Sequence, residues 1–159
     1  ATAPTLPTGY TKQRRSGAVV RASAALLGFV QDGDDFTRTT PILDVDTTNP
    51  GAAAVTATLA SIPTGFKVPV RCNVYLKNGT TAVLMAYLSS LDQTDSAPSA
   101  TAAPLASTGS SISATIETYA QVTIRTNTSA QIRYRLNASG AADIIRIVPT
   151  GWTDRRGRG

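Results

Sequence analysis

The chain has no histidine, one cysteine and one glutamate among its 159 residues. Without histidine, a Ser-His-Asp triad and the usual zinc sites are excluded. Glu117 has no acidic partner in an arrangement that suits glycoside hydrolysis, and no phosphate-binding or dinucleotide-binding glycine motif occurs. We therefore expect no catalytic residue, no cofactor and no metal site on this chain.

The sequence also predicts neither an internal disulfide nor a membrane span. A lone Cys72 cannot form an internal disulfide, and its place among alternating apolar residues predicts a buried side chain rather than a nucleophile. No run of about 18 apolar residues occurs, so we expect no membrane span. Asp32-Gly33-Asp34-Asp35 lacks the spacing and terminal glutamate of an EF-hand loop, which favours a hairpin turn over a calcium site.

Aromatic residues are scarce as well. They make up 6% of the chain, against 42% for all hydrophobic residues, many of which are alanine. A core of Val, Ile, Leu and Ala buries less apolar area than one that contains Phe and Trp. A chain of this length can form one domain, but its modest core favours association, and we predict a homotrimer.

Apolar and polar residues alternate with a period of two in most of the chain, which is typical of half-buried β-strands. The alternation is clearest over residues 66–75 and 116–125 and recurs over 131–137 and 144–148. No segment combines apolar spacing of 3.6 with helical caps. The alternating segments and the turn signals between them predict eight to ten short strands. This number is typical of an all-β antiparallel sandwich or jelly roll.

Two hairpins are predicted from turn residues. Asn78-Gly79 suits a type I′ turn, so residues 82–88 should fold back antiparallel on 66–75 as a central strand covered on both faces. Pro69 lacks an amide donor, which predicts a sheet edge or a bulge at that point. Asp32-Gly33 predicts a tight hairpin. We predict an extended arm over residues 1–15, a β-sandwich domain over 16–153 and a basic tail over 154–159.

Charge is unevenly distributed along the chain. Between Asp32 and Asp95 seven acids and four bases give a net charge of −3, and because the whole chain carries +5, the two ends together carry +8. This distribution could meet nucleic acid, an acidic polysaccharide or an acidic patch on a partner, or it could be a solvated face. Nucleic acid is not the expected partner, because Tyr119, Tyr134 and Trp152 form no series of stacking platforms.

A candidate contact surface combines a sheet face with a loop. Residues 91–111 are rich in Ser, Ala, Thr, Pro and Gly, so we predict an exposed loop that is mobile or ordered by a partner. Strand alternation predicts that outward arginines share one sheet face. The candidate contact residues are Tyr119, Arg125, Arg133 and Arg135, together with Asp92 and Asp95 at the start of the loop.

Trp152 is the only tryptophan and precedes a tail that contains Arg155, Arg156 and Arg158. A large apolar ring in this position should be docked on the domain or on an adjacent subunit rather than serve as a stacking platform for a ligand. We predict that Trp152 anchors the tail and that the tail arginines pair with acids such as Asp32, Asp34 or Asp35.

Six phrases along the chain resemble, in this order, the C-terminal domains of tail-fibre and related virion proteins of tailed bacteriophages and prophages. The resemblance covers nearly the whole chain. It is carried by residues 6–10 with Arg14-Arg15, 31–34, 44–45 with 48–51, 97–106, 125–133 and 151–158.

The resemblance implies a virion structural protein, all-β and often trimeric, that follows other segments in a longer polypeptide and is assembled in the host cytoplasm. Such a protein would attach to a host-surface protein or glycan, or to neighbouring fibre subunits. Two alternatives stay open: a capsid decoration or head-fibre protein, and a polyanion-binding module. The family offers no catalytic motif to transfer to this chain.

Overall fold

A computed structural model describes residues 5–10, 17–22, 24–79, 83–99, 101, 106–107 and 116–155. Within them the chain forms twelve strands and no helix, so nothing in this part could cross a membrane as a helix. The strands are β1 (Arg21–Ala22), β2 (Ala25–Leu26), β3 (Phe29–Asp32), β4 (Asp35–Arg38), β5 (Val45–Thr48), β6 (Val55–Thr58), β7 (Pro69–Asn78), β8 (Met85–Ser89), β9 (Ala106–Ser107), β10 (Ile116–Arg125), β11 (Gln131–Leu136) and β12 (Ile144–Thr153).

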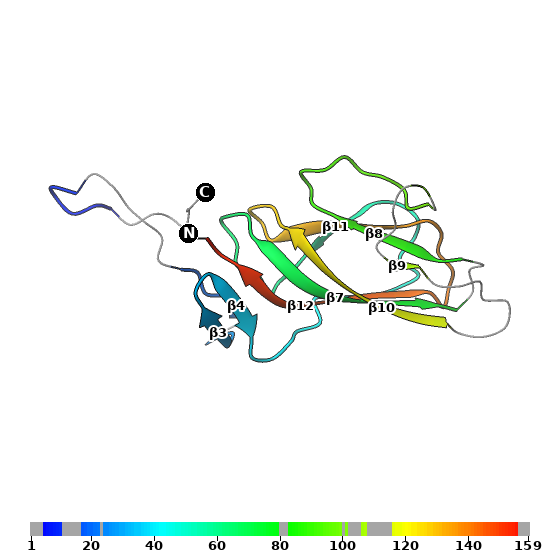
Figure 1. Ribbon diagram of the computed structural model, residues 1–159, viewed down its shortest axis with the longest axis horizontal. Helices are drawn as coiled ribbons and strands as arrows, with labels where there is room; N and C mark the ends of the chain where they lie inside the picture. Colours follow the sequence, from blue (N-terminus) through cyan, green and yellow to red (C-terminus); the bar gives the residue numbers. More distant parts are fainter. Residues whose placement is uncertain are drawn as a thin grey trace.

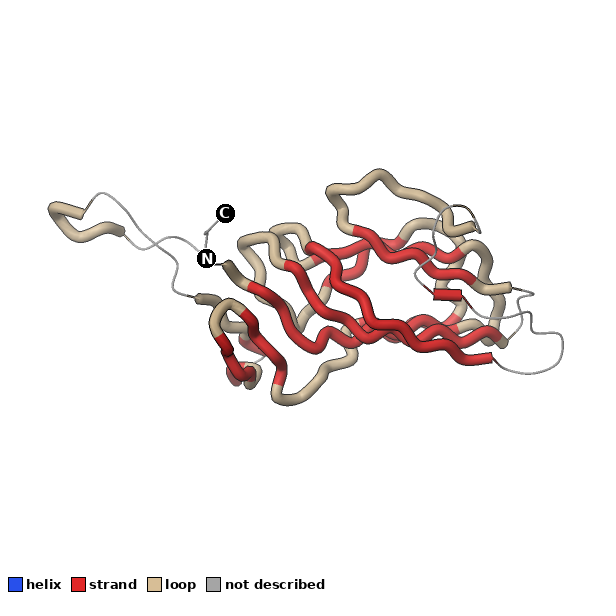
Figure 2. Tube along the Cα trace, in the orientation of Figure 1, coloured by secondary structure: helices blue, strands red, loops and turns tan. Residues whose placement is uncertain are grey.

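Two antiparallel sheets make up the domain (Figures 1 and 2). The six-stranded sheet has the order β10-β7-β12-β4-β3, and β5 also pairs with β12. The four-stranded sheet has the order β6-β11-β8-β9, and β1 and β2 form a separate two-stranded ribbon. The prediction of an all-β antiparallel sandwich is confirmed, whereas its jelly-roll part is not.

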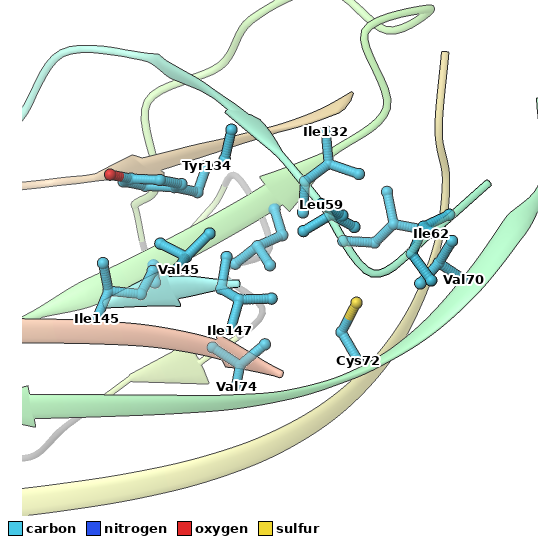
Figure 3. Packing of buried hydrophobic residues seen from close by; sticks show 14 of the residues in the cluster. Val45, Leu59, Ile62, Val70, Cys72, Val74, Ile132, Tyr134, Ile145 and Ile147 are labelled. Atoms are coloured by element: carbon cyan, nitrogen blue, oxygen red, sulfur yellow. The ribbon is translucent and has the colours of Figure 1, made fainter. Parts of the chain in front are cut away.

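The core lies between the two large sheets and is mainly aliphatic (Figure 3). Val70, Cys72 and Val74 of β7 point inward, as their alternation predicted, and each is at most 2% exposed. Ile132 of β11 and Leu59 pack from the opposite side. Complete burial of such a side chain stabilises the fold by roughly 1.5–3 kcal/mol relative to exposure.

The hairpin predicted at Asn78-Gly79 is wrong. β7 pairs with β10 and β12, whereas β8 lies in the other sheet beside β11 and β9. Both edges of β7 are therefore occupied, and the following strand has no free edge to join. Asn78 is a buried strand residue, Gly79 donates its N–H to Asp143 Oδ1 at 2.9 Å, and neither has the positive φ of a type I′ turn.

Pro69 does not mark a sheet edge or a bulge. It is the first residue of β7, an interior strand, where a missing donor is tolerated. The bulge lies instead in β12, where Pro149 is opposite Cys72 and Gly151 is opposite Arg71. One extra residue, Thr150, is thus inserted between these two pairs.

The bulge changes which residues of β12 point inward. Ile145 and Ile147 are buried on one parity and Trp152 on the other, opposite Val70. Gly151 allows the close approach of β4, because a Cβ there would lie 2.2 Å from the Phe36 carbonyl oxygen. One strand can therefore contribute to two parts of the core.

Of the remaining strand predictions, some are confirmed and one is corrected. β3 and β4 form the tight hairpin expected at Asp32-Gly33, and Gly33 has the positive φ of 58° that the turn requires. β10 and β11 show the predicted alternation. The predicted loop over residues 91–111 is not wholly a loop, because β9 pairs with β8 within it. Where the structure describes the predicted arm, over residues 5–10, no strand is formed.

Candidate functional site

A row of side chains crosses four strands on the outer face of the six-stranded sheet. Tyr119 of β10 is opposite Tyr75 of β7, Tyr75 is opposite Arg146 of β12, and Arg146 is opposite Asp46 of β5. These residues occupy the outward positions of alternating strands, with the core side chains one position away. The antiparallel register therefore places two aromatic rings and an ion pair side by side.

The members of this row touch one another. The centroids of the Tyr75 and Tyr119 rings are 5.4 Å apart, with an angle of 53° between the ring planes. The guanidinium carbon of Arg146 lies 5.3 Å from the Tyr75 ring centroid, and its Nε donates to Asp46 Oδ1 at 2.8 Å. This hydrogen bond and the charge of Asp46 raise the pKa of Arg146.

Glu117 fixes both tyrosines. The hydroxyl of Tyr75 donates to Glu117 Oε1 at 2.9 Å, and that of Tyr119 donates to Oε2 at 3.0 Å. These two hydrogen bonds lower the pKa of Glu117, and the bond from Tyr75 has the larger effect. The pKa of Tyr75 is raised by burial and then by Glu117, whereas that of Tyr119 is raised first by its bond to Glu117.

Two amides lie beside the rings, two residue pairs further along the strands and so on the same outer face. Gln121 of β10 is opposite Asn73 of β7, and its Nε2 donates to Asn73 Oδ1 at 3.3 Å. These amides, the tyrosines, Arg146 and Val148 line an open cavity of about 570 Å³. Tyr119 is 73% exposed at its margin. We call the following group the tyrosine site: Asp46, Asn73, Tyr75, Glu117, Tyr119, Gln121 and Arg146.

The chemistry of the tyrosine site suits binding. The raised pKa values of Tyr75 and Tyr119 keep their hydroxyls protonated at neutral pH, so the reactive phenolate form is not present. In the part of the chain that the structure describes, no group of three or more His, Cys, Asp or Glu residues could hold a metal ion. An exposed ring beside groups that both donate and accept hydrogen bonds is a surface for recognition.

The arginines of the predicted contact surface do not share a face. Arg125 ends β10 in the six-stranded sheet, whereas Arg133 and Arg135 lie on β11 in the other sheet. Thr126, which is fully buried and donates its N–H to the Val68 carbonyl at 2.9 Å, begins the crossing between the sheets. The prediction of one common face is wrong because these strands are successive in sequence but not paired.

The two predicted acids are paired with bases. Asp92 forms an ion pair with Lys67, which lowers its pKa, and the charge of Arg125 acts in the same direction. Asp95 forms an ion pair with Arg135. Residues 91–99 are thus tied to the body of the domain, and a contact role for these acids stays a prediction.

Trp152 lies within β12 and is fully buried in its own domain. Its ring stacks on Phe36 with centroids 5.0 Å apart and 9° between the planes, and the guanidinium carbon of Arg38 lies 4.9 Å from its centroid. Asp35, an expected partner of the tail, is paired instead with Arg71 at 2.8 Å. Arg155 is exposed, and the predicted pairings of Arg156 and Arg158 lie outside the described residues.

Sequence reasoning identified Tyr119 but missed the rest of the tyrosine site. One signal was available, since Tyr75 and Tyr119 both occupy polar positions of strongly alternating segments. Their proximity follows from the pairing of β10 with β7, whereas the sequence predicts that residues 66–75 pair with residues 82–88.

The fold is an all-β sandwich, and the tyrosine site with its open cavity lies on the outer face of one sheet. Comparisons of the chain with protein-family models, with curated proteins and with solved structures found no significant match.

Proposed function

We propose that the chain is a structural protein of a bacteriophage virion, of the tail-fibre type, that attaches to the host surface through the tyrosine site. The observation that carries the attachment role is a fixed but largely exposed aromatic ring, that of Tyr119, at the margin of an open cavity. An aromatic ring held out to water on a folded domain is a feature of binding surfaces. The resemblance of the sequence to tail-fibre C-terminal domains supports the virion assignment.

Ion pairing of four bases on the domain argues against a polyanion site around them. Lys67, Arg71, Arg135 and Arg146 each form an ion pair with an aspartate, so their charges are largely compensated. A phosphate backbone is bound by clustered bases that release counterions, and these four bases would offer it little net charge.

The proposal includes assembly as a homotrimer, in which subunits bury apolar surface against one another. Two exposed apolar side chains are of the kind that a neighbouring subunit would cover: Leu26 in the β1–β2 ribbon and Val19 just before it. Light scattering on the purified chain should give the mass of a trimer. A stable monomer at micromolar concentration would contradict this part of the proposal.

Two experiments test the function. Antibody against the chain, applied to virions of the phage or prophage that encodes it, should label a tail appendage in negative-stain images. The purified chain should also compete with those virions for adsorption to the host. Label on capsid faces would instead support a decoration or head-fibre protein, and label on no part of the virion would overturn the proposal.

A further inference from the structure

The ring of Tyr119 is exposed to solvent but held in one position by its neighbours. Its hydroxyl is fixed by Glu117 and its ring rests against Tyr75, yet 73% of the residue is exposed. A fixed ring loses little conformational freedom on binding, so contact with it is not offset by ordering. The occupant should therefore offer an apolar face about the size of the phenol ring.

The polar groups beside the ring require an occupant that both donates and accepts hydrogen bonds. Asn73 uses its Oδ1 and Gln121 its Nε2 in their mutual bond. Among hydrogen bonds within the described residues, the Asn73 N–H donors and the Gln121 carbonyl oxygen are left for a ligand. Hydroxyl groups match both, whereas an ionised phosphate or carboxylate only accepts.

The charges around the ring offer no net attraction to a strongly anionic occupant. Asp46 and Glu117 balance Lys77 and Arg146, and Arg146 is already paired with Asp46. Glu117, whose pKa is lowered by the two tyrosine hydroxyls, stays ionised beside the Tyr119 ring at neutral pH. An anion there would gain no net electrostatic attraction, whereas a neutral hydroxyl group needs none.

From this chemistry we infer that the tyrosine site binds a neutral saccharide. The inference rests on the proposed attachment function and names its ligand class. The apolar C–H face of a pyranose ring stacks on Tyr119, and its hydroxyls bond to Asn73 and Gln121, which line the cavity with that ring. The open cavity of about 570 Å³ suits a short segment of a longer glycan, whose remaining rings stay in solvent.

The first test measures binding of the intact chain to defined probes. Methyl glycosides of glucose, galactose, mannose and N-acetylglucosamine, free glucuronic acid, and the purified surface polysaccharide of the host are titrated while backbone amide NMR signals are followed. We expect a neutral glycoside or the polysaccharide to shift signals of β7 and β10. Affinity should change little with salt, because the contact is uncharged.

Three variants assign the site. Tyr119→Ala removes the stacking ring and should weaken binding about tenfold or more, whereas Tyr119→Phe keeps the ring and should stay within a few-fold of the parent. Tyr10→Ala is the matched control, because Tyr10 is 69% exposed and lies outside the site. The inference is overturned if neither the glycosides nor the polysaccharide binds, if glucuronic acid or a steeply salt-dependent ligand is preferred, or if Tyr119→Ala binds as the parent does.

A cell-binding assay separates failure of this inference from failure of the proposed function. Host cells are treated with periodate, which cleaves vicinal diols in saccharides, or with protease, before the labelled chain is added. Loss of binding after periodate alone supports the saccharide. Loss after protease alone overturns the saccharide while attachment stands, and no binding to untreated cells overturns the attachment function itself.

Discussion

The centre of the sandwich and the end of the six-stranded sheet are packed with different kinds of residue. At the centre, Val74, Ile132 and Ile147 meet between two sheets that cover each other (Figure 3). β3 and β4 lie toward the opposite end of the molecule from β8 and β9 (Figure 1). There Phe36 and Trp152 form the core as a stacked pair.

The difference teaches how a chain with few aromatics uses them. Where two sheets face each other, aliphatic side chains fill the space from both sides. At the end, large rings supply bulk, and Arg38 covers Trp152 although its Nε and Nη2 are buried without a hydrogen-bond partner in the described part of the chain. Such unpaired groups are costly, so the aromatic end combines large apolar burial with a polar penalty.

Removing the indole should be the largest perturbation and would break the aromatic end alone. Trp152→Ala should cost about 3–5 kcal/mol in the free energy of unfolding, because a fully buried ring is replaced by a cavity. Truncation after Asp154 should cost far less, since Arg155 is exposed and exposed ion pairs contribute only about 0–1 kcal/mol. Thermal unfolding of both variants makes the comparison. A truncation as destabilising as Trp152→Ala would show that the tail carries the stability.

A single methylene removed from the aliphatic centre should have a smaller effect. Ile147→Val should cost about 0.5–1.5 kcal/mol, because Ile147 is fully buried and its neighbours can close only part of the gap. Urea unfolding measures the change. A cost as large as that of Trp152→Ala would mean that the centre is the more rigidly packed of the two regions.

Outside both cores, loss of a surface ion pair should matter less again. Asp95→Ala removes the partner of Arg135 on the outer face of the four-stranded sheet. Because both side chains are partly exposed, we expect a loss of about 0–1 kcal/mol that shrinks at high salt. Unfolding at low and high salt tests this, with Asp95→Asn as the control that keeps the shape but not the charge.

The smallest effect should be a pH trend at the junction of the two regions. The charge of Asp44 acts on Arg38 at the aromatic end and on Cys72 in the centre. Burial raises the pKa of the Asp44 carboxyl above its ordinary 3.8, against the lowering effect of its bonds from Ser61. The folded chain thus holds this proton more tightly than the unfolded one, so the stabilising contribution is complete below pH 3.8 and is lost as pH rises through the raised value.

Asp44→Asn, which does not titrate, isolates this trend. The stability of the parent relative to the variant should fall as pH rises from 3.8 toward neutral and then level off. Asp35, Asp92 and Glu117 have lowered pKa values, so their contributions to the stability of the fold are lost as pH falls. These contributions are the same in both proteins and cancel in the difference. Urea unfolding across this pH range is the measurement, and a difference that grows with pH would contradict the sign.

The sequence predicted what depends on local pattern. The inward positions of residues 66–75 and 116–125 were predicted correctly because alternation depends only on neighbouring residues. Pairing was not predictable in the same way, since β7 lies between β10 and β12, which come much later in the chain. The hairpin signal at Asn78-Gly79 was a local preference overruled by these long-range contacts.

The candidate site shows the same division. Tyr119 was recognisable as an outward aromatic residue, but its partners come from strands whose neighbours the sequence does not specify. Glu117 and Tyr75 are 42 positions apart and meet only through the register of two long strands. The arginines failed for the converse reason, because Arg125 and Arg133 are close in sequence but lie in different sheets.

The bulge in β12 also restricts how this protein can change during evolution. Its one extra residue determines that Ile147 and Trp152 both point inward although they lie on opposite parities. Loss of Thr150 would turn Trp152 outward while leaving every other residue intact, and an insertion would have the same effect. Homologous chains should therefore keep both the number of residues between Pro149 and Trp152 and the glycine at position 151, whereas a surface turn such as Gly33-Asp34 can accept a change in length.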